Sequence, residues 1–114
     1  MADAKINALY LYYRLKEAHM QITQNDDGKH GLFRLQDGDN SAGEMKYTWA
    51  GPTMFIIDST HVDDAYRGQN VGRTLLDAVV AFAREKNLKV IPLCPFAKAQ
   101  FDKDASLRDV LREA

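Results

Sequence analysis

The chain has 114 residues, 46% of them hydrophobic and 27% charged, which is the size and composition of one globular domain. Lysine and arginine number 15 and aspartate and glutamate 16, and the net charge of -1 gives no general attraction to nucleic acid or acidic membranes. The single cysteine excludes an internal disulfide, and the three histidines lack the spacing of metal ligands. We expect a cytoplasmic protein, monomeric or weakly dimeric, with no metal, membrane segment or nucleic-acid partner.

Turn signals divide the first half of the chain into its expected elements. Residues 4–19 carry apolar side chains at helical spacing, which predicts a helix within an N-terminal extension, 1–20. Glycine with Asn and Asp marks turns at 25–28 and 37–41. The patterns around these turns predict about three antiparallel strands, at 31–35, 43–50 and 53–62. The apolar run MFII in the third is typical of a strand covered on both faces.

The second half predicts a strand–helix–strand unit. Apolar residues recur at intervals of three and four from Val71 to Ala83, as in a helix of about four turns. Asn87 followed by Leu88 is typical of a left-handed helix end, and a strand is expected at 88–94. Such a unit needs parallel strands and a right-handed crossover. The tail should form two short helices, the second capped by Ser106. The expected fold is α+β, an antiparallel meander followed by a β-α-β unit in one domain, 1–114.

A glycine-bearing loop joins the expected strand 53–62 to the helix. Its sequence at 67–74 is RGQNVGRT. Free backbone N–H groups and the helix dipole make such a helix start an anion site, for which pyrophosphate is a natural guest. The loop lacks the Lys-Ser/Thr pair of a Walker motif and the GxGxxG pattern of dinucleotide sites. The alternative interpretation is a glycine-rich helix start without a ligand.

The loop resembles motif A of the GNAT acyltransferase superfamily, Q/R-x-x-G-x-G/A. Arg67 and Gly72 match this pattern, whereas Asn70 stands at the first glycine position. Asn tolerates the left-handed region better than other non-glycine residues, so the loop shape can survive. Together with the segments RGQNVGRTLLDAVVAFARE and KVIPLCPFAK, the chain is similar over 31–112 to small single-domain GNAT-like proteins of the YjdJ type. The N-terminal extension lies outside this similarity.

This resemblance implies a trimmed GNAT fold and an acetyl-CoA-dependent N-acetyltransferase with an unidentified amine acceptor. The alternative is a CoA-binding or acyl-CoA-sensing module of the same fold without catalysis. The resemblance also implies that a backbone N–H of the strand before the loop aligns the thioester. The residues expected at the cofactor are Val62, Arg67, Gly68, Gln69, Asn70, Val71, Gly72, Arg73 and Thr74, with Phe96 and Lys98 as further candidates for the pantetheine and phosphate groups.

Two side chains are candidates for the chemistry of transfer. His61 and Cys94 should lie near the carboxyl ends of neighbouring parallel strands, where open α/β sheets bind ligands. Pro92 cannot donate a ladder hydrogen bond, which fits a separation of the two strands at that end. Cys94 is a candidate nucleophile, a candidate general acid, or a small buried residue. His61 is a candidate base or a hydrogen-bonded residue of the strand end.

Overall fold

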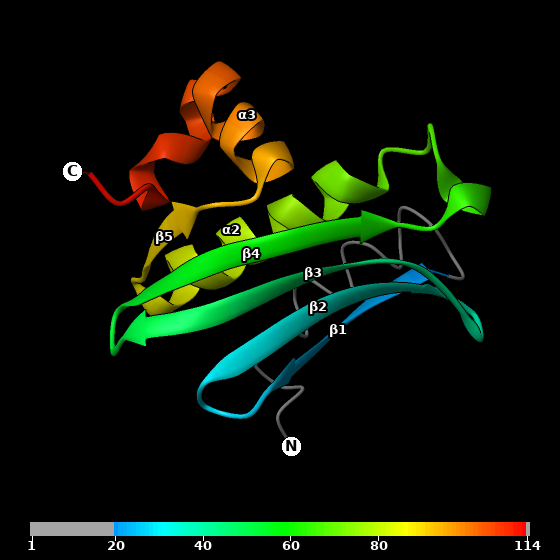
Figure 1. Cartoon of the computed structure of the whole chain (residues 1–114), viewed down its shortest axis with the longest axis horizontal. Helices are drawn as coiled ribbons and strands as arrows, with labels where there is room; N and C mark the ends of the chain where they lie inside the picture. Colours follow the sequence, from blue (N-terminus) through cyan, green and yellow to red (C-terminus); the bar gives the residue numbers. More distant parts are fainter. Residues whose placement is uncertain (1–19, 114) are drawn as a thin grey trace.

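The computed structural model describes residues 20–113, which form a five-stranded sheet with helices on it (Figure 1). The strand order is β1-β2-β3-β4-β5. The helix expected at 4–19, and with it nearly all of the expected extension 1–20, lies outside the described residues. Over the described part, the mixed fold of an antiparallel meander and a β-α-β unit is confirmed.

Four strands form the antiparallel meander, one more than the sequence predicted. They are β1 (Met20–Asp26), β2 (His30–Asp37), β3 (Asn40–Gly51) and β4 (Met54–Val62). The unpredicted strand β1 reads MQITQND, and Ile22 is its one fully buried side chain. The strand β1 is held by its pairing with β2 along seven residue pairs rather than by a wide apolar face. Its side chains are mostly polar, and the alternation of apolar and polar residues that indicates a strand is therefore weak in its sequence.

The strand β4 differs from the expectation of burial on both faces. Phe55 and Ile57 are fully buried, whereas Met54 and Ile56 are only half-buried. The run MFII is therefore an alternating strand with one core face. An extra residue interrupts this alternation, because Tyr47 of β3 pairs with Ile57 while the preceding Lys46 pairs with Ser59. Asp58 is thus the additional residue of a β-bulge.

One long helix supplies most of the apolar packing against the sheet. Helix α2 (Val71–Lys86) follows a short 3-10 turn, η2 (Asp64–Tyr66), and its buried stripe meets Phe33, Tyr47 and Phe55. Asn87 is left-handed, with φ of 59°, and the Leu88 N–H bonds the Ala83 carbonyl at 2.8 Å. The predicted helix end is confirmed, since these are the bonds of a left-handed C-terminal cap.

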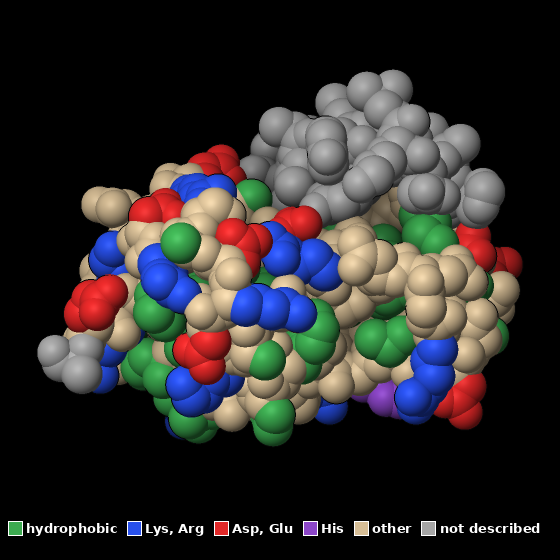
Figure 2. All heavy atoms as spheres, turned by 90° about the horizontal axis from the view of Figure 1, so that it is seen from above, with side chains coloured by type: hydrophobic (Ala, Val, Ile, Leu, Met, Phe, Trp, Pro, Cys, Tyr) green, Lys and Arg blue, Asp and Glu red, His purple; other side chains and the backbone are tan. Residues whose placement is uncertain are grey.

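The C-terminal segment packs beside α2 near β5 (Lys89–Pro92) (Figure 1). It consists of α3 (Pro95–Lys103) and the 3-10 helix η3 (Ala105–Val110). The predicted cap at Ser106 is wrong: Asp104 caps η3, its carboxylate accepting the Ser106 N–H at 3.0 Å and the Ser106 hydroxyl at 2.6 Å. Positive and negative side chains are interspersed over the face that carries this segment (Figure 2). Arg84 of α2 pairs with Asp109 of η3 at 2.8 Å. None of the described helices is long and apolar enough to cross a membrane.

The parallel strands β4 and β5 separate after four residue pairs. Pairing runs from Met54 with Lys89 to Ile57 with Pro92. The N–H groups of Leu93 and Cys94 both bond the Ile57 carbonyl, each at 3.1 Å, and the chain then turns into α3. The separation expected at Pro92 is therefore confirmed, and Ile57 lies at its apex. The strand expected at 88–94 ends earlier, at Pro92.

Candidate functional site

A groove of about 400 Å³ lies where β4 has left β5. Side chains from four successive parts of the fold meet there, namely the end of β4, the loop after it, the first turn of α2 and the start of α3. The lining residues are Thr60, Val62, Tyr66, Arg67, Gly68, Asn70, Val71, Gly72, Arg73 and Phe96. The groove thus contains seven of the nine residues predicted at the cofactor, while Gln69 and Thr74 are not among its lining.

The β-bulge decides which residues of β4 face this groove. Without the extra residue Asp58, the alternation from Ile57 would place His61 on the core face. With it, Thr60 pairs with the fully buried Met45, and Val62 pairs with Gly43. Val62 consequently lies on the helix face, since a Cβ on Gly43 would meet the Val71 side chain at 2.8 Å. Thr60 and Val62 therefore face the helices.

The open edge of β4 exposes backbone groups beside the groove. The Asp63 N–H bonds the Ala42 carbonyl of β3 at 2.9 Å. Backbone groups alternate in direction along an extended strand, so the N–H and C=O of Val62 and Thr60 point away from β3. Beyond Ile57 there is no β5 residue to pair with them among the described strands. This edge can hydrogen-bond an extended ligand.

Two residues of the loop before α2 have positive φ values. Gly68 has φ of 84°, and Asn70 has φ of 64° and ψ of 26°, in the left-handed region. The Asn70 side chain makes no cap bond, whereas its carbonyl accepts from the Thr74 N–H and hydroxyl, each at 3.0 Å. The first-turn N–H groups of α2 thus lack a side-chain cap from Asn70, and free N–H groups at a helix start are typical of an anion site.

Gly72 and Phe96 bring the starts of α2 and α3 into contact. A Cβ on Gly72 would stand 2.9 Å from the Phe96 ring. Phe96 is partly buried and lines the groove, so the ring packs against the α2 backbone on one side and the groove on the other. The second motif glycine is therefore needed for close approach between the helices.

Arg73 lines the groove, but its guanidinium is bound elsewhere. Its Nε donates to Asp77 at 2.8 Å, and its two terminal nitrogens donate to Gln100 at 3.1 Å and Asp104 at 2.6 Å. The bonds to Asp77 and Asp104 raise the pKa of Arg73. The bonds from Ser106 and then Arg73 lower the pKa of Asp104 from 3.8 to about 2. Arg73 therefore joins α2 to the C-terminal segment.

Cys94 lies at the strand separation, as expected, and is 4% exposed. It is the N-cap of α3, and its sulfur accepts the Ala97 N–H at 3.4 Å. The same sulfur lies 3.2 Å from the hydroxyl oxygen of Thr60, which lines the groove. The thiol therefore caps α3 and packs behind Thr60, which forms part of the groove wall.

His61 lies on the opposite face of the sheet from the groove. It pairs with Glu44, and its side chain is 66% exposed with Nε2 3.2 Å from an Asp63 carboxylate oxygen. The structure therefore does not bring His61 and Cys94 together, since the β-bulge turns His61 outward.

Thr60 and Tyr66 are lining residues that sequence reasoning did not select. The Tyr66 hydroxyl donates to the Asp37 carboxylate at 2.7 Å, which fixes the loop against the end of β2. This bond raises the pKa of Tyr66. Knowledge of the β-bulge would have shown that Thr60 faces the groove, but the bulge depends on pairing between distant strands and cannot be predicted from one segment.

The site and fold together are those of an acyl-CoA-dependent acyltransferase, with a glycine loop before a helix and a separated parallel strand pair. The family model described as GCN5-related N-acetyl-transferase matches residues 32–110. The chain belongs to this family. The family uses acetyl-CoA as co-substrate, and by family and fold this chain is an acetyl-CoA-dependent N-acetyltransferase whose acceptor amine is unidentified.

Individual relatives agree with this assignment. The NMR structure of a GCN5-like N-acetyltransferase candidate from Staphylococcus aureus is 37% identical, covers 85% of this chain and 92% of its own, and has a TM-score of 0.67. Protein NATD1 of Danio rerio is 28% identical over 80% of this chain and 77% of its own length. A crystal structure of an aminoglycoside acetyltransferase from a soil metagenome is 15% identical, covers 78% of this chain and 63% of its own, and has a TM-score of 0.54. That last likeness concerns the fold alone.

Proposed function

We propose that the groove holds acetyl-CoA and that the acetyl group is transferred directly from its thioester to a small amine. The observation that carries this proposal is the position of the groove, which runs from the left-handed loop at Asn70 to the point where β4 leaves β5. A helix start suited to a phosphate group and an open strand edge are therefore continuous. Such an arrangement suits a ligand with an anionic end and a long, hydrogen-bonding arm.

The loop 67–74 would bind the pyrophosphate through backbone N–H groups. The positive φ values of Gly68 and Asn70 support this role, because they turn successive amides toward one point. Gly72 leaves the α2 backbone uncovered except by the Phe96 ring. The side chain of Arg67 is 72% exposed, and its ion-pair partner within the described residues, Asp64, is more exposed still, so Arg67 can turn toward a phosphate. Arg73 would contribute its amide, since its guanidinium is engaged.

The open edge of β4 would bind the arm of the cofactor. Val62 stands next to the loop, and Thr60 lies two residues closer to the apex at Ile57. A strand rises about 3.3 Å per residue, so the edge from Val62 to Ile57 offers roughly 16 Å of backbone. With the pyrophosphate at the loop, the arm lies along Val62 and Thr60. Their N–H groups would align it and hold the thioester oxygen.

The roles of the two predicted catalytic side chains follow from their surroundings. The burial of Cys94 and its bonds to Ala97 and Thr60 support a structural role. We therefore favour direct transfer over an acetylated cysteine. His61 is exposed on the outer face of the sheet and lies four residues along β4 from the apex at Ile57. Its distance from the apex favours the other role considered for it, a hydrogen-bonded residue of the strand end, and His61→Gln should leave both the transfer rate and the acetyl-CoA affinity close to the wild type.

Ligand-dependent stabilisation and transfer assays test this proposal. Acetyl-CoA at a hundred times its dissociation constant should raise the free energy of unfolding by about 2.7 kcal/mol. CoA release in the presence of a panel of amines then measures transfer. An absence of stabilisation by both acetyl-CoA and CoA would overturn the groove assignment. Stabilisation without transfer to any amine would favour the non-catalytic CoA-binding module.

A further inference from the structure

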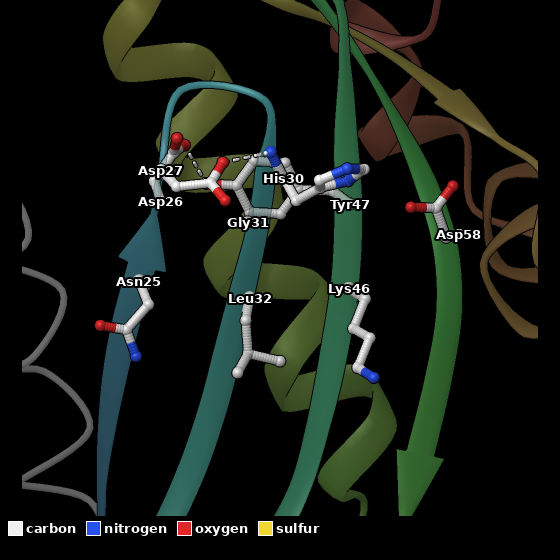
Figure 3. Close-up of a pocket in the computed structure, with 9 residues that line it drawn as sticks. All are labelled: Asn25, Asp26, Asp27, His30, Gly31, Leu32, Lys46, Tyr47 and Asp58. Carbon is white, nitrogen blue, oxygen red and sulfur yellow. Dashed lines mark hydrogen bonds between the residues drawn. The ribbon is translucent and has the colours of Figure 1, made fainter.

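A second hollow, of about 560 Å³, lies on the face of the sheet opposite α2 (Figure 3). In Figure 3, α2 runs behind the sheet, whereas the side chains of Leu32, Lys46 and Asp58 project in front of it. Its lining comes from all four antiparallel strands and the turn between β1 and β2. The residues are Asn25, Asp26, Asp27, His30, Gly31, Leu32, Lys46, Tyr47 and Asp58. Neither the family resemblance nor the groove explains this hollow.

Asp58 joins this hollow to the point where β4 and β5 separate. It follows Ile57 directly, and Ile57 is the last β4 residue paired with β5. The β-bulge frees Asp58 from strand pairing and turns its side chain to the outer face, where its carboxylate accepts the Thr48 hydroxyl at 2.6 Å. Thr60, two residues on, faces the groove on the other side. The two sites therefore lie on opposite faces of β4, next to the gap between β4 and β5.

We propose that this hollow receives the acceptor amine, and that Asp58 binds its ammonium group and accepts its proton. This inference rests on the proposed function, because it needs the thioester near the apex at Ile57. An acceptor must approach the thioester from a side that the cofactor does not occupy. The groove occupies the helix face of β4, which leaves the outer face. Asp58 is closer to the apex along β4 than His61.

Two further residues position the Asp58 carboxylate. The Thr48 hydroxyl donates its hydrogen to Asp58, and the Thr48 oxygen lies 3.3 Å from the His30 Nδ1. Because the hydroxyl hydrogen is given to Asp58, the His30 contact requires Nδ1 to be the donor. The chain His30–Thr48–Asp58 thus runs across three strands and fixes one carboxylate oxygen. The second oxygen of Asp58 would then bind the ammonium group. Thr48 and His30 are positioning residues.

The step balances without another reactant. The ammonium group of the acceptor gives one proton to Asp58, and the free amine attacks the thioester carbon. A C–N bond forms, the C–S bond breaks, and the electron pair of that bond leaves with sulfur. The nitrogen gives up its second proton, which neutralises the CoA thiolate. Asp58 returns the first proton to solvent, so the products are an N-acetyl amine, CoA and one released proton.

The charges in the hollow select the class of amine. Three carboxylates line it, those of Asp26, Asp27 and Asp58, whereas its one lining cation among the described residues, Lys46, is 3.9 Å from a Glu44 oxygen. A carboxylate attached beside the reacting amine would face Asp58 and be repelled. We therefore expect a small cationic amine as acceptor rather than an amino acid. Cadaverine and lysine form a matched pair of probes, because they differ only by the α-carboxylate.

The first test compares Asp58→Asn with Asp39→Asn. Both substitutions remove one carboxylate, but Asp39 lies in the β2–β3 turn outside both sites. We expect Asp58→Asn to lower kcat/KM for cadaverine about a hundredfold, with acetyl-CoA affinity unchanged. Asp39→Asn should match the wild type. Thr48→Val should lower kcat more than it changes KM for cadaverine, and Thr48→Ser should restore it. Wild-type kcat/KM in Asp58→Asn, or its loss in His61→Gln alone, would overturn the assignment.

The second test locates the amine without relying on turnover. In the CoA-bound protein, titration with cadaverine should shift the amide resonances of Leu32, Lys46 and Asp58. Lysine should bind there with a dissociation constant at least about ten times higher. Shifts confined to other parts of the chain, or no shifts at millimolar cadaverine, would overturn the proposal. A protein that binds neither CoA nor acetyl-CoA would instead contradict the proposed function, so the two failures are distinguishable.

Discussion

The Gly72 backbone lies against the edge of the Phe96 ring, so closely that a Cβ on Gly72 would stand 2.9 Å from the ring's Cζ. Gly72 is the second residue of α2 and Phe96 the second of α3, and both residues line the groove. The contact therefore sets the distance between the helices that flank the proposed cofactor. A change in either residue should alter the groove before it alters the rest of the fold.

Gly72→Ala should weaken acetyl-CoA binding while the protein stays folded. The new methyl group forces the Phe96 ring outward, and such overpacking costs typically about 1–3 kcal/mol. The higher helix propensity of alanine offsets up to about 1 kcal/mol of this cost. The double variant Gly72→Ala/Phe96→Leu should recover part of the lost stability, because leucine leaves room for the methyl group. Chemical denaturation and titration with acetyl-CoA measure both effects. Strictly additive effects in the double variant would show that the two residues are not coupled.

Asn70→Ala and Asn70→Gly should have opposite outcomes. Asn70 has φ of 64°, where alanine costs roughly 1 kcal/mol more than asparagine or glycine. We expect Asn70→Ala to lower the free energy of unfolding by about that amount and to weaken acetyl-CoA binding. Asn70→Gly, which restores the motif glycine, should keep both the free energy of unfolding and the affinity for acetyl-CoA close to the wild type. Thermal denaturation with and without acetyl-CoA checks this pair. If Asn70→Ala bound acetyl-CoA as tightly as the wild type, the left-handed conformation of the loop would not be needed for ligand binding.

The outcome at Asn70 shows where sequence reasoning succeeds. Positive φ at a loop residue, a left-handed helix end at Asn87 and a strand interruption at Pro92 are local properties of one residue and its neighbours. Each was predictable from residue type alone. The order of the meander, helix and parallel strand followed for the same reason, since hydrophobic period and turn residues are local signals.

The errors arose where distant segments decide the structure. The bulge at Asp58 depends on pairing with β3, and it reverses the faces of Thr60 and His61. The guanidinium of Arg73 bonds Asp104, 31 residues away. The strand β1 is fixed by its pairing with β2, because six of its seven residues are not fully buried. No pattern within one segment reports these contacts.

Substitution of Cys94 separates its structural role from a nucleophilic one. The sulfur accepts the Ala97 N–H as the cap of α3, and loss of such a cap costs about 1 kcal/mol. Cys94→Ser should keep the cap and transfer acetyl at a rate close to the wild type. Cys94→Ala should be less stable but still active. Intact mass after incubation with acetyl-CoA should show no acetyl group on the wild-type protein. An acetyl group at Cys94 that an added amine removes would instead establish a covalent route.

The bond network at Asp104 should be sensitive to acid. Bonds from Ser106 and Arg73 lower the pKa of this carboxyl from 3.8 to about 2, so its contribution to stability is complete above pH 3.8 and is lost as the pH falls toward 2. We expect Asp104→Asn to melt at a lower temperature than the wild type at neutral pH. The gap should narrow from about pH 4 to about pH 2. Thermal melts across this range test it, and a gap independent of pH would contradict the network.

The most direct test of the central claim is an amide chemical-shift titration of the wild-type protein with acetyl-CoA. The account predicts that the largest shifts fall on Thr60, Val62 and the loop 67–74, with Phe96 affected through its ring. Asn70→Ala should weaken all of these shifts together. Saturable shifts elsewhere on the sheet, with the loop unchanged, would contradict the claim that this groove holds the cofactor.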